Sequence, residues 1–315
     1  MRESGILMHI TSLPGPYGVG TMGKQAYAFV DFLKDAGQSC WQILPLNPTG
    51  YGDSPYQSCS TFAGNHYLID LESLIEQGLL RREEVEPIDW CWSETKADFG
   101  KLYNNRLNVL RIAYTRFQGG NDFELFLEDN EAWLPDFAMF MALKAKNFGE
   151  PWYNWEPGVK NRYPEAMDAM RWELRDEIRF YCFVQYLFHK QWTALRSYAN
   201  ANGIKIIGDV PIYVPLDSVE VWAEPGMFQL DENLTPKVIA GCPPDAFSAD
   251  GQLWGNPIYH WENMAAEGYS WWIDRLKAAE KLYDVVRIDH FRGFDEYFSI
   301  PAETGKALDG HWEKG

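Results

Sequence analysis

Four short apolar runs alternate with amphipathic stretches along the chain. The runs are GILMHI (5–10), CWQILPL (40–46), IKIIGDVPIYV (204–214) and VVRIDHF (285–291), and each has the length of a buried strand bounded by polar or turn residues. Between the first two runs, residues 24–37 place apolar side chains near helical spacing and end in glycine. Because helices between consecutive strands imply parallel strands, the pattern predicts an α/β fold with a parallel sheet.

Amphipathic helices are also expected before the third and fourth runs. Residues 173–203 form a long amphipathic pattern that ends at an Asn-Gly pair, and residues 270–282 begin at a serine, a favoured N-cap. The intervening region 47–172 is too long for a loop and contains further helical patterns. We therefore expect an inserted, mainly helical subdomain there.

Composition narrows the class of partner. The chain has 315 residues and a net charge of −17, which argues against nucleic acid or anionic membrane as a partner because a phosphate surface requires a basic face. Its 14 Trp, 17 Tyr and 18 Phe favour carbohydrate, since flat rings cover the apolar faces of sugars, although aromatic residues also fill large cores. Five scattered cysteines and an N-terminus without a signal-peptide core predict a soluble, cytoplasmic protein.

Polar side chains gather where the predicted strands end. The first run ends near His9, the third contains Asp209, and the fourth ends in Arg287, Asp289 and His290. In parallel α/β sheets and barrels, the ligand site lies at the carboxyl ends of the strands. The sequence therefore predicts a functional site at this edge of the sheet.

Arg287 and Asp289 alternate on the fourth strand, so both side chains should face the same way. A neighbouring arginine favours the ionised form of a carboxylate, and an ionised carboxylate in an aromatic-lined site can attack an anomeric carbon. A structural ion pair at a strand end is the alternative. Asp209 follows Gly208, where the chain can come close to a ligand, and suits sugar hydroxyls; otherwise it is a turn aspartate before Pro211.

Other candidates have equally plain alternatives. His290 could donate to a hydroxyl or be a satisfied core histidine. The loop 50–57 gathers Tyr51, Asp53, Ser54 and Tyr56, which ordinary turn chemistry also explains. Metal binding and a Ser-His-Asp triad lack support, because no His/Cys pair has ligand spacing and no G-x-S-x-G motif occurs.

Five motifs, in this order, resemble the amylomaltases, the 4-α-glucanotransferases of glycoside hydrolase family 77 in the α-amylase clan. They are SLPGPYGVGTMG, LPLNPTGYGDSPYQSCSTFAGN, GDVPIYV, AGCPPDAFSADGQLWGNPIYHW and VVRIDHFRGF, and the resemblance covers residues 5–315. It implies a (β/α)8 TIM barrel with helical insertions. It also implies transfer of α-1,4-glucan segments between maltooligosaccharides through a covalent intermediate with retention, and no metal or organic cofactor.

The resemblance also implies roles for single residues. Asp289 would be the nucleophile, Arg287 its electrostatic partner, and His290 a contact to the sugar at the cleaved position. Asp209 and Tyr56 would bind the same sugar or its neighbour, with Ser54 nearby. The substrate-binding residues implied for the acceptor side are Asp245, Phe247, Trp254 and Asn256.

The chain is expected to hold only about the first four strands of such a barrel. Only 24 residues follow Phe291, whereas four further β/α units need about 120. A retaining mechanism also needs a second carboxyl group as general acid/base. The family carries it as a glutamate in a later EDLG-like motif, which does not occur in this sequence. We therefore expect a C-terminally truncated chain that is inactive alone.

The expected division is a partial catalytic barrel at 1–46 and 203–315 and a largely helical subdomain at 47–202. An insertion at about 215–268 would form the acceptor-side loop. Two other functions remain open at this point: an α-glucan hydrolase of the same clan, and a non-catalytic glucan-binding fragment.

Overall fold

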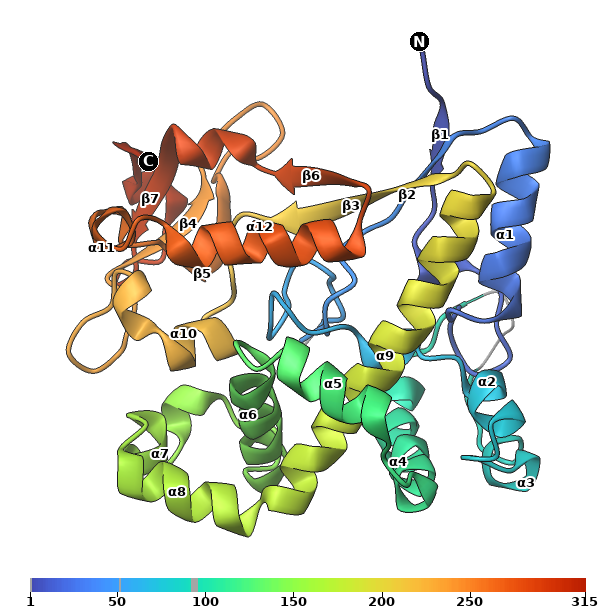
Figure 1. Ribbon diagram of the computed structural model, residues 1–315. Helices are drawn as coiled ribbons and strands as arrows, with labels where there is room; N and C mark the ends of the chain where they lie inside the picture. Colours follow the sequence, from blue (N-terminus) through green and yellow to red (C-terminus); the bar gives the residue numbers. More distant parts are fainter. Residues whose placement is uncertain (1, 51, 92–95) are drawn as a thin grey trace.

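A four-stranded parallel sheet lies at the centre of the computed structural model, which describes residues 2–50, 52–91 and 96–315. Its strands, in spatial order, are β1 (Gly5–Leu7), β2 (Cys40–Gln42), β3 (Lys205–Pro211) and β6 (Val285–Asp289), and every neighbouring pair is parallel (Figure 1). The four strands fall within the four apolar runs. The predicted α/β class with a parallel sheet is therefore confirmed.

The outer strands of this sheet are more exposed than their sequences suggest. Trp41 in β2 and Ile206 in β3 are fully buried, but Leu7 in β1 is 55% exposed and Val285 in β6 is 44% exposed. The prediction that the run starting at Val285 is a buried strand is wrong. The reason is topological, because β6 has a strand partner on one side only.

Three helices pack along the sheet. They are α1 (Lys24–Asp35), α9 (Arg175–Ala201) and α12 (Ser270–Leu282); α9 contacts α1 and β3, and α12 contacts β3 and β6 (Figure 1). Helix α1 buries Ala26, Val30 and Leu33 on one stripe and is followed by Gly37 at a φ of +66°, which is the glycine stop that the sequence predicts. No helix in the described part of the chain is long and apolar enough to cross a membrane.

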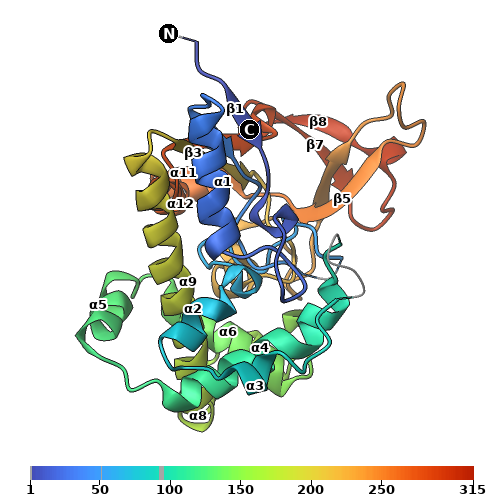
Figure 2. The same ribbon diagram turned by 90° about the vertical axis from the view of Figure 1, so that its right-hand side faces the viewer.

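The segment between β2 and β3 contains most of the remaining helices. These are α2 (Leu71–Glu76), α3 (Arg82–Val85), α4 (Phe99–Arg116), α5 (Asn121–Asp129), α6 (Leu134–Lys146), α7 (Pro157–Lys160) and α8 (Pro164–Glu173). They lie below the sheet in Figures 1 and 2, around the first half of α9. Aromatic side chains such as Phe123, Phe140 and Phe183 are almost completely buried between them.

A second sheet, which the sequence analysis does not predict, is antiparallel and stands beside the first (Figure 2). Its order is β5 (Gln252–Pro257), β4 (Val238–Cys242), β7 (Glu296–Pro301) and β8 (His311–Lys314). The region 215–268, expected to form an acceptor-side loop, thus contains the β4–β5 hairpin together with α10 (Val219–Ala223) and α11 (Trp261–Ala266). The hairpin connection, 243–251, is one of several loops in this region, together with 228–237 before β4 and 258–260 before α11.

Candidate active site

Side chains from three segments meet at the carboxyl edge of the parallel sheet. Arg287 in β6 donates from Nη1 to both carboxylate oxygens of Asp209 in β3, at 2.6 and 2.7 Å, and from Nη2 to Oδ1 of Asp289 at 2.5 Å. Tyr56, in the loop after β2, donates its hydroxyl to Asp209 Oδ2 at 2.7 Å. We call Tyr56, Asp209, Arg287 and Asp289 the strand-end cluster.

The two carboxylates of the cluster differ in their surroundings. The Asp209 side chain is 1% exposed and has hydrogen bonds to both oxygens, whereas Asp289 is 41% exposed beside an Arg287 that is 44% exposed. Partial burial lowers the pKa of Arg287, but the hydrogen bonds and charges of Asp209 and Asp289 outweigh it and raise that pKa above its ordinary value. Asp289 is therefore an accessible carboxylate held beside a permanent cation.

The surroundings of Tyr56 also change the pKa of its phenol. Burial, and then the hydrogen bond to Asp209, raise the pKa of Tyr56 to about 12. The hydroxyl therefore stays protonated at neutral pH and acts as a donor to Asp209.

Strand register brings the charged residues together. Asp209 and Arg287 are directly paired across β3 and β6, and Asp289 is paired with Pro211 two positions further on. Because side chains two apart on a strand share a face, Arg287 and Asp289 point the same way, as the sequence predicts. Gly208, by contrast, does not make room for a ligand: a Cβ there would lie 2.2 Å from the Tyr283 ring, so the glycine is needed for packing.

An aromatic group lies next to the cluster. The His290 ring packs edge-to-face on Trp254 of β5 with centroids 5.0 Å apart, and Tyr213 lies 6.4 Å from His290. Burial lowers the pKa of His290 although the Asp289 charge opposes it, which favours a neutral imidazole that can both donate and accept. His290 is half-buried, so it is not the satisfied core histidine that the sequence left open.

Tyr213 was not singled out from the sequence. It lies in the third apolar run, just after the end of β3, and is 6% exposed. Its ring stacks on Tyr259 at 5.9 Å and also faces Trp254 at 6.3 Å. An aromatic residue just beyond a strand-end aspartate was the available signal.

Within the described part of the chain, Ser54 is hydrogen-bonded to the backbone of the cluster residue Tyr56, whereas Asp245, Phe247 and Asn256 have no hydrogen bond to the cluster. Ser54 Oγ accepts from the Tyr56 backbone N–H at 3.3 Å, and Asp245 Oδ1 accepts from the backbone of Phe247 and Ser248 at 2.8 Å, so both shape turns. Phe247 is 98% exposed, and Asn256 is buried in β5. Tyr51, in the same loop as Ser54, lies outside the described residues.

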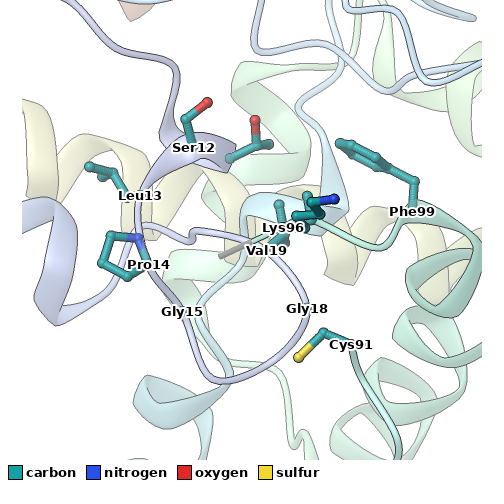
Figure 3. A pocket seen from close by; sticks show the side chains of 11 residues that line it. Ser12, Leu13, Pro14, Gly15, Gly18, Val19, Cys91, Lys96 and Phe99 are labelled. Atoms are coloured by element: carbon teal, nitrogen blue, oxygen red, sulfur yellow. The ribbon is translucent and has the colours of Figure 1, made fainter. Parts of the chain in front are cut away.

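A cavity of about 440 Å³ lies elsewhere, between the loop after β1 and the start of α4. Figure 3 shows Leu13 and Pro14, in the loop that runs from Ser12 to Gly18, on one side of this pocket and Phe99 on the other. None of the four residues of the strand-end cluster is among the described residues that line it. The cavity is therefore separate from the candidate active site.

Carboxylates, a cation and aromatic rings at the carboxyl edge of a parallel sheet define an α/β protein with a strand-end site of the kind found in barrel enzymes. The chain belongs to the 4-α-glucanotransferase family, glycoside hydrolase family 77, whose model matches residues 8–315. This agrees with the resemblance seen in the sequence motifs.

Individual relatives support the same assignment. The chain is 50% identical to a 4-α-glucanotransferase of Streptococcus pneumoniae, over 100% of this chain and 63% of the relative, and 49% identical to one of Thermus thermophilus, over 99% and 63%. An amylomaltase from Streptococcus agalactiae, solved in complex with acarbose, superposes with a TM-score of 0.97 at 45% identity and covers 100% of this chain and 64% of that one. The chain thus spans about 63% of the length of these curated relatives.

Proposed function

We propose that the protein is a 4-α-glucanotransferase that moves α-1,4-glucan segments between maltodextrins. The observation that carries the proposal is the strand-end cluster of a member of this family, in which Arg287 holds an accessible Asp289 beside a buried Asp209 that accepts hydrogen bonds at both oxygens. The partners are accordingly maltooligosaccharides and α-1,4-glucans, and the proposed location is the cytoplasm.

Asp289 is the proposed nucleophile. One of its oxygens forms a bond to the anomeric carbon while the bond from that carbon to the departing glucan oxygen breaks, and the departing oxygen takes up a proton from a general acid. The 4-hydroxyl of an acceptor glucan then attacks the same carbon and gives its proton to the group that acted as general acid, while the bond from that carbon to Asp289 breaks and releases the carboxylate. Two inversions give retention of configuration.

Arg287 is the proposed orienting residue for the nucleophile. Its guanidinium is held at two points by Asp209, so its second nitrogen can fix Asp289 Oδ1 without turning. The other oxygen of Asp289 has no hydrogen bond from Arg287 and is the one proposed to attack.

Asp209 and Tyr56 are the proposed binding residues for the sugar at or beside the cleaved bond. Each oxygen of a carboxylate can accept more than one hydrogen bond, so Asp209 can still accept from a sugar hydroxyl while bonded to Arg287 and Tyr56. A half-buried phenol ring also offers an apolar face to the sugar. Ser54 supports the turn before Tyr56.

The acceptor side is proposed to lie along β5 and its loop. Trp254 and His290 offer an aromatic face next to Asp289, and the neutral imidazole favours a hydrogen bond to a sugar oxygen. The hairpin loop would present Asp245 and the exposed Phe247 to the next sugar units, with Asn256 behind them. A lid of this kind would favour transfer by excluding water.

We assign the segments of the chain to two parts of the protein. Residues 1–46 and 203–315 would form the catalytic barrel part, with the insertion at about 215–268 on the acceptor side. Residues 47–202 would form the helical subdomain, apart from the loop that brings Tyr56 to the sheet.

Product analysis on maltotriose tests the proposal. The native gene product that contains these residues should release glucose together with oligomers longer than maltotriose, and Asp289→Asn should abolish both at an unchanged fold. Glucose and maltose without longer oligomers would instead establish the hydrolase. Glucan binding without turnover by the 315-residue chain alone would agree with the expectation that this chain is inactive by itself.

A further inference from the structure

Glu220 is a buried carboxyl group that the proposed chemistry does not use. It lies in α10 and is 4% exposed. Its Oε1 accepts three hydrogen bonds from two adjacent residues of one loop: from the Thr61 backbone N–H at 2.7 Å, from the Thr61 hydroxyl at 3.1 Å and from the Ser60 hydroxyl at 3.3 Å. These three hydrogen bonds to one oxygen join α10 to the loop that contains Ser60 and Thr61, and we call this contact the clamp.

The second carboxyl oxygen of Glu220 makes no hydrogen bond within the described part of the chain. Glu220 Oε2 is buried and has no hydrogen-bond partner among the described residues. Burial raises the pKa of Glu220 despite the opposing effects of the Thr61 hydrogen bonds and the Arg275 charge. Because Oε2 has no described partner, the hydrogen bonds of the clamp all fall on Oε1, and the side chain of glutamine could supply that one accepting oxygen.

The clamped loop is the base of the segment that carries Tyr56. Ser58 Oγ donates to the Ser60 carbonyl at 2.8 Å, and Ser58 pairs in antiparallel fashion with Thr49. The Gly50 N–H donates to the Gln57 carbonyl at 2.9 Å, which closes the segment into a hairpin-like loop. We call the described residues 49–50 and 52–61 the Tyr56 loop.

The Tyr56 loop is thus held at two points, near its middle and at its C-terminal end, by different elements. Tyr56 itself reaches Asp209 in β3, and Ser60 and Thr61 reach Glu220 in α10. The Val219 N–H also donates to the Cys59 carbonyl at 2.9 Å, so α10 contacts the base of the loop twice.

We propose that Glu220 is a positioning residue that holds the Tyr56 loop in place, so that Tyr56 meets Asp209 and the strand-end cluster can bind sugar. The effect on sugar affinity rests on the proposed function, whereas the effect on the loop does not. Removing the carboxyl group releases three donors at the base of the loop, two of them hydroxyls and one a backbone N–H.

Two measurements on the 315-residue chain test this inference. Hydrogen exchange of peptides within 49–61 reports the loop, and calorimetric titration with acarbose reports the cluster. Glu220→Ala should speed exchange in the Tyr56 loop at least about 10-fold and raise the acarbose Kd by a similar factor. Glu220→Gln keeps the accepting oxygen and the volume, so both quantities should stay within about 2-fold of wild type.

Gln191→Ala is the matched control. Gln191 is also buried and clamps a loop, accepting from the Asp70 N–H at 2.7 Å and donating to the Asp70 carbonyl at 3.1 Å. Its removal should lower the unfolding temperature while leaving exchange in the Tyr56 loop and acarbose affinity unchanged. If Glu220→Ala does not fold, Thr61→Val removes one of the three donors and should give both effects at about 3-fold.

The outcomes separate the inference from the proposed function. Unchanged exchange in the Tyr56 loop of a folded Glu220→Ala or Thr61→Val variant overturns the clamp, as does an equal loss of affinity in Gln191→Ala. Faster exchange with unchanged acarbose affinity overturns its link to the cluster. If the wild-type chain does not bind acarbose, the sugar-binding roles proposed for Asp209 and Tyr56 are not supported by this chain, and the exchange result alone decides the role of Glu220.

Discussion

Arg287 is the residue on which the strand-end cluster depends, and Arg287→Ala is the most informative single perturbation. The substitution removes the two hydrogen bonds to Asp209, at 2.6 and 2.7 Å, and the one to Asp289 at 2.5 Å. It leaves two carboxylates at one strand end without their cation, and one of them, Asp209, is 1% exposed.

The expected magnitude follows from this burial. Removing one partner of a buried ion pair costs about 3–5 kcal/mol. Arg287 is 44% exposed, and solvent screening therefore reduces the expected cost to about 2 kcal/mol. Arg171→Ala is the control, because the Arg171–Asp168 pair is 60% and 75% exposed and should contribute no more than about 0.5 kcal/mol.

Urea unfolding measures these free energies, and a double-mutant cycle assigns them to the pair. In an Asp209→Asn background the buried group is neutral and needs no cation, so the cost of Arg287→Ala should fall by at least about 1 kcal/mol. A cost below about 0.5 kcal/mol, or the same cost in both backgrounds, would refute the argument that Arg287 compensates a buried charge.

Three further results are expected. Tyr56→Phe removes one donor from Asp209 and should cost about 1–2 kcal/mol in urea unfolding and weaken acarbose binding, whereas Tyr163→Phe at an exposed position should change neither. Burial lowers the pKa of His9 to about 4, so His9 takes up a proton at a lower pH in the folded state than in the unfolded state. The His9 contribution to the free energy of unfolding should be complete above about pH 6.5 and fall by up to about 3 kcal/mol toward pH 4. His9→Gln should reduce this loss, and a difference between wild type and His9→Gln that does not change with pH would contradict the argument. Phe247→Ala, at a 98% exposed position, should leave the unfolding free energy within about 0.5 kcal/mol but raise the KM for acceptor glucan in the native gene product; an unchanged KM would remove Phe247 from the acceptor side.

The parallel sheet could be predicted because its strands are short apolar runs between clear turn signals. The exposure of Val285 could not, because burial depends on how many neighbours a strand has, and β6 has one. The second sheet was missed for a different reason. The pairing of β4 with β5 shifts register between Ile239 and Gly241, and the burial along these two strands does not alternate cleanly.

The candidate site was predictable to a similar degree. Alternation along one strand places Arg287 and Asp289 on one face, and this is a local property. The double role of Arg287 is not local, since it requires the β3–β6 register that sets Asp209 opposite Arg287. The contact of Glu220 with the Tyr56 loop could not be predicted from the sequence pattern, because α10 has only five residues and the loop is about 160 positions away in the chain.

The claim at the centre of this account is that Asp289 is the nucleophile, and covalent trapping tests it most directly. A 5-fluoro-α-glucosyl fluoride carries a leaving group that departs as fluoride without a general acid, and the ring fluorine slows release of the resulting ester. Mass spectrometry of the digested protein should find one glucosyl adduct, on the peptide that contains Asp289, and Asp289→Asn should abolish it. An adduct on Asp209 or another residue, or none on the native gene product, would contradict the account.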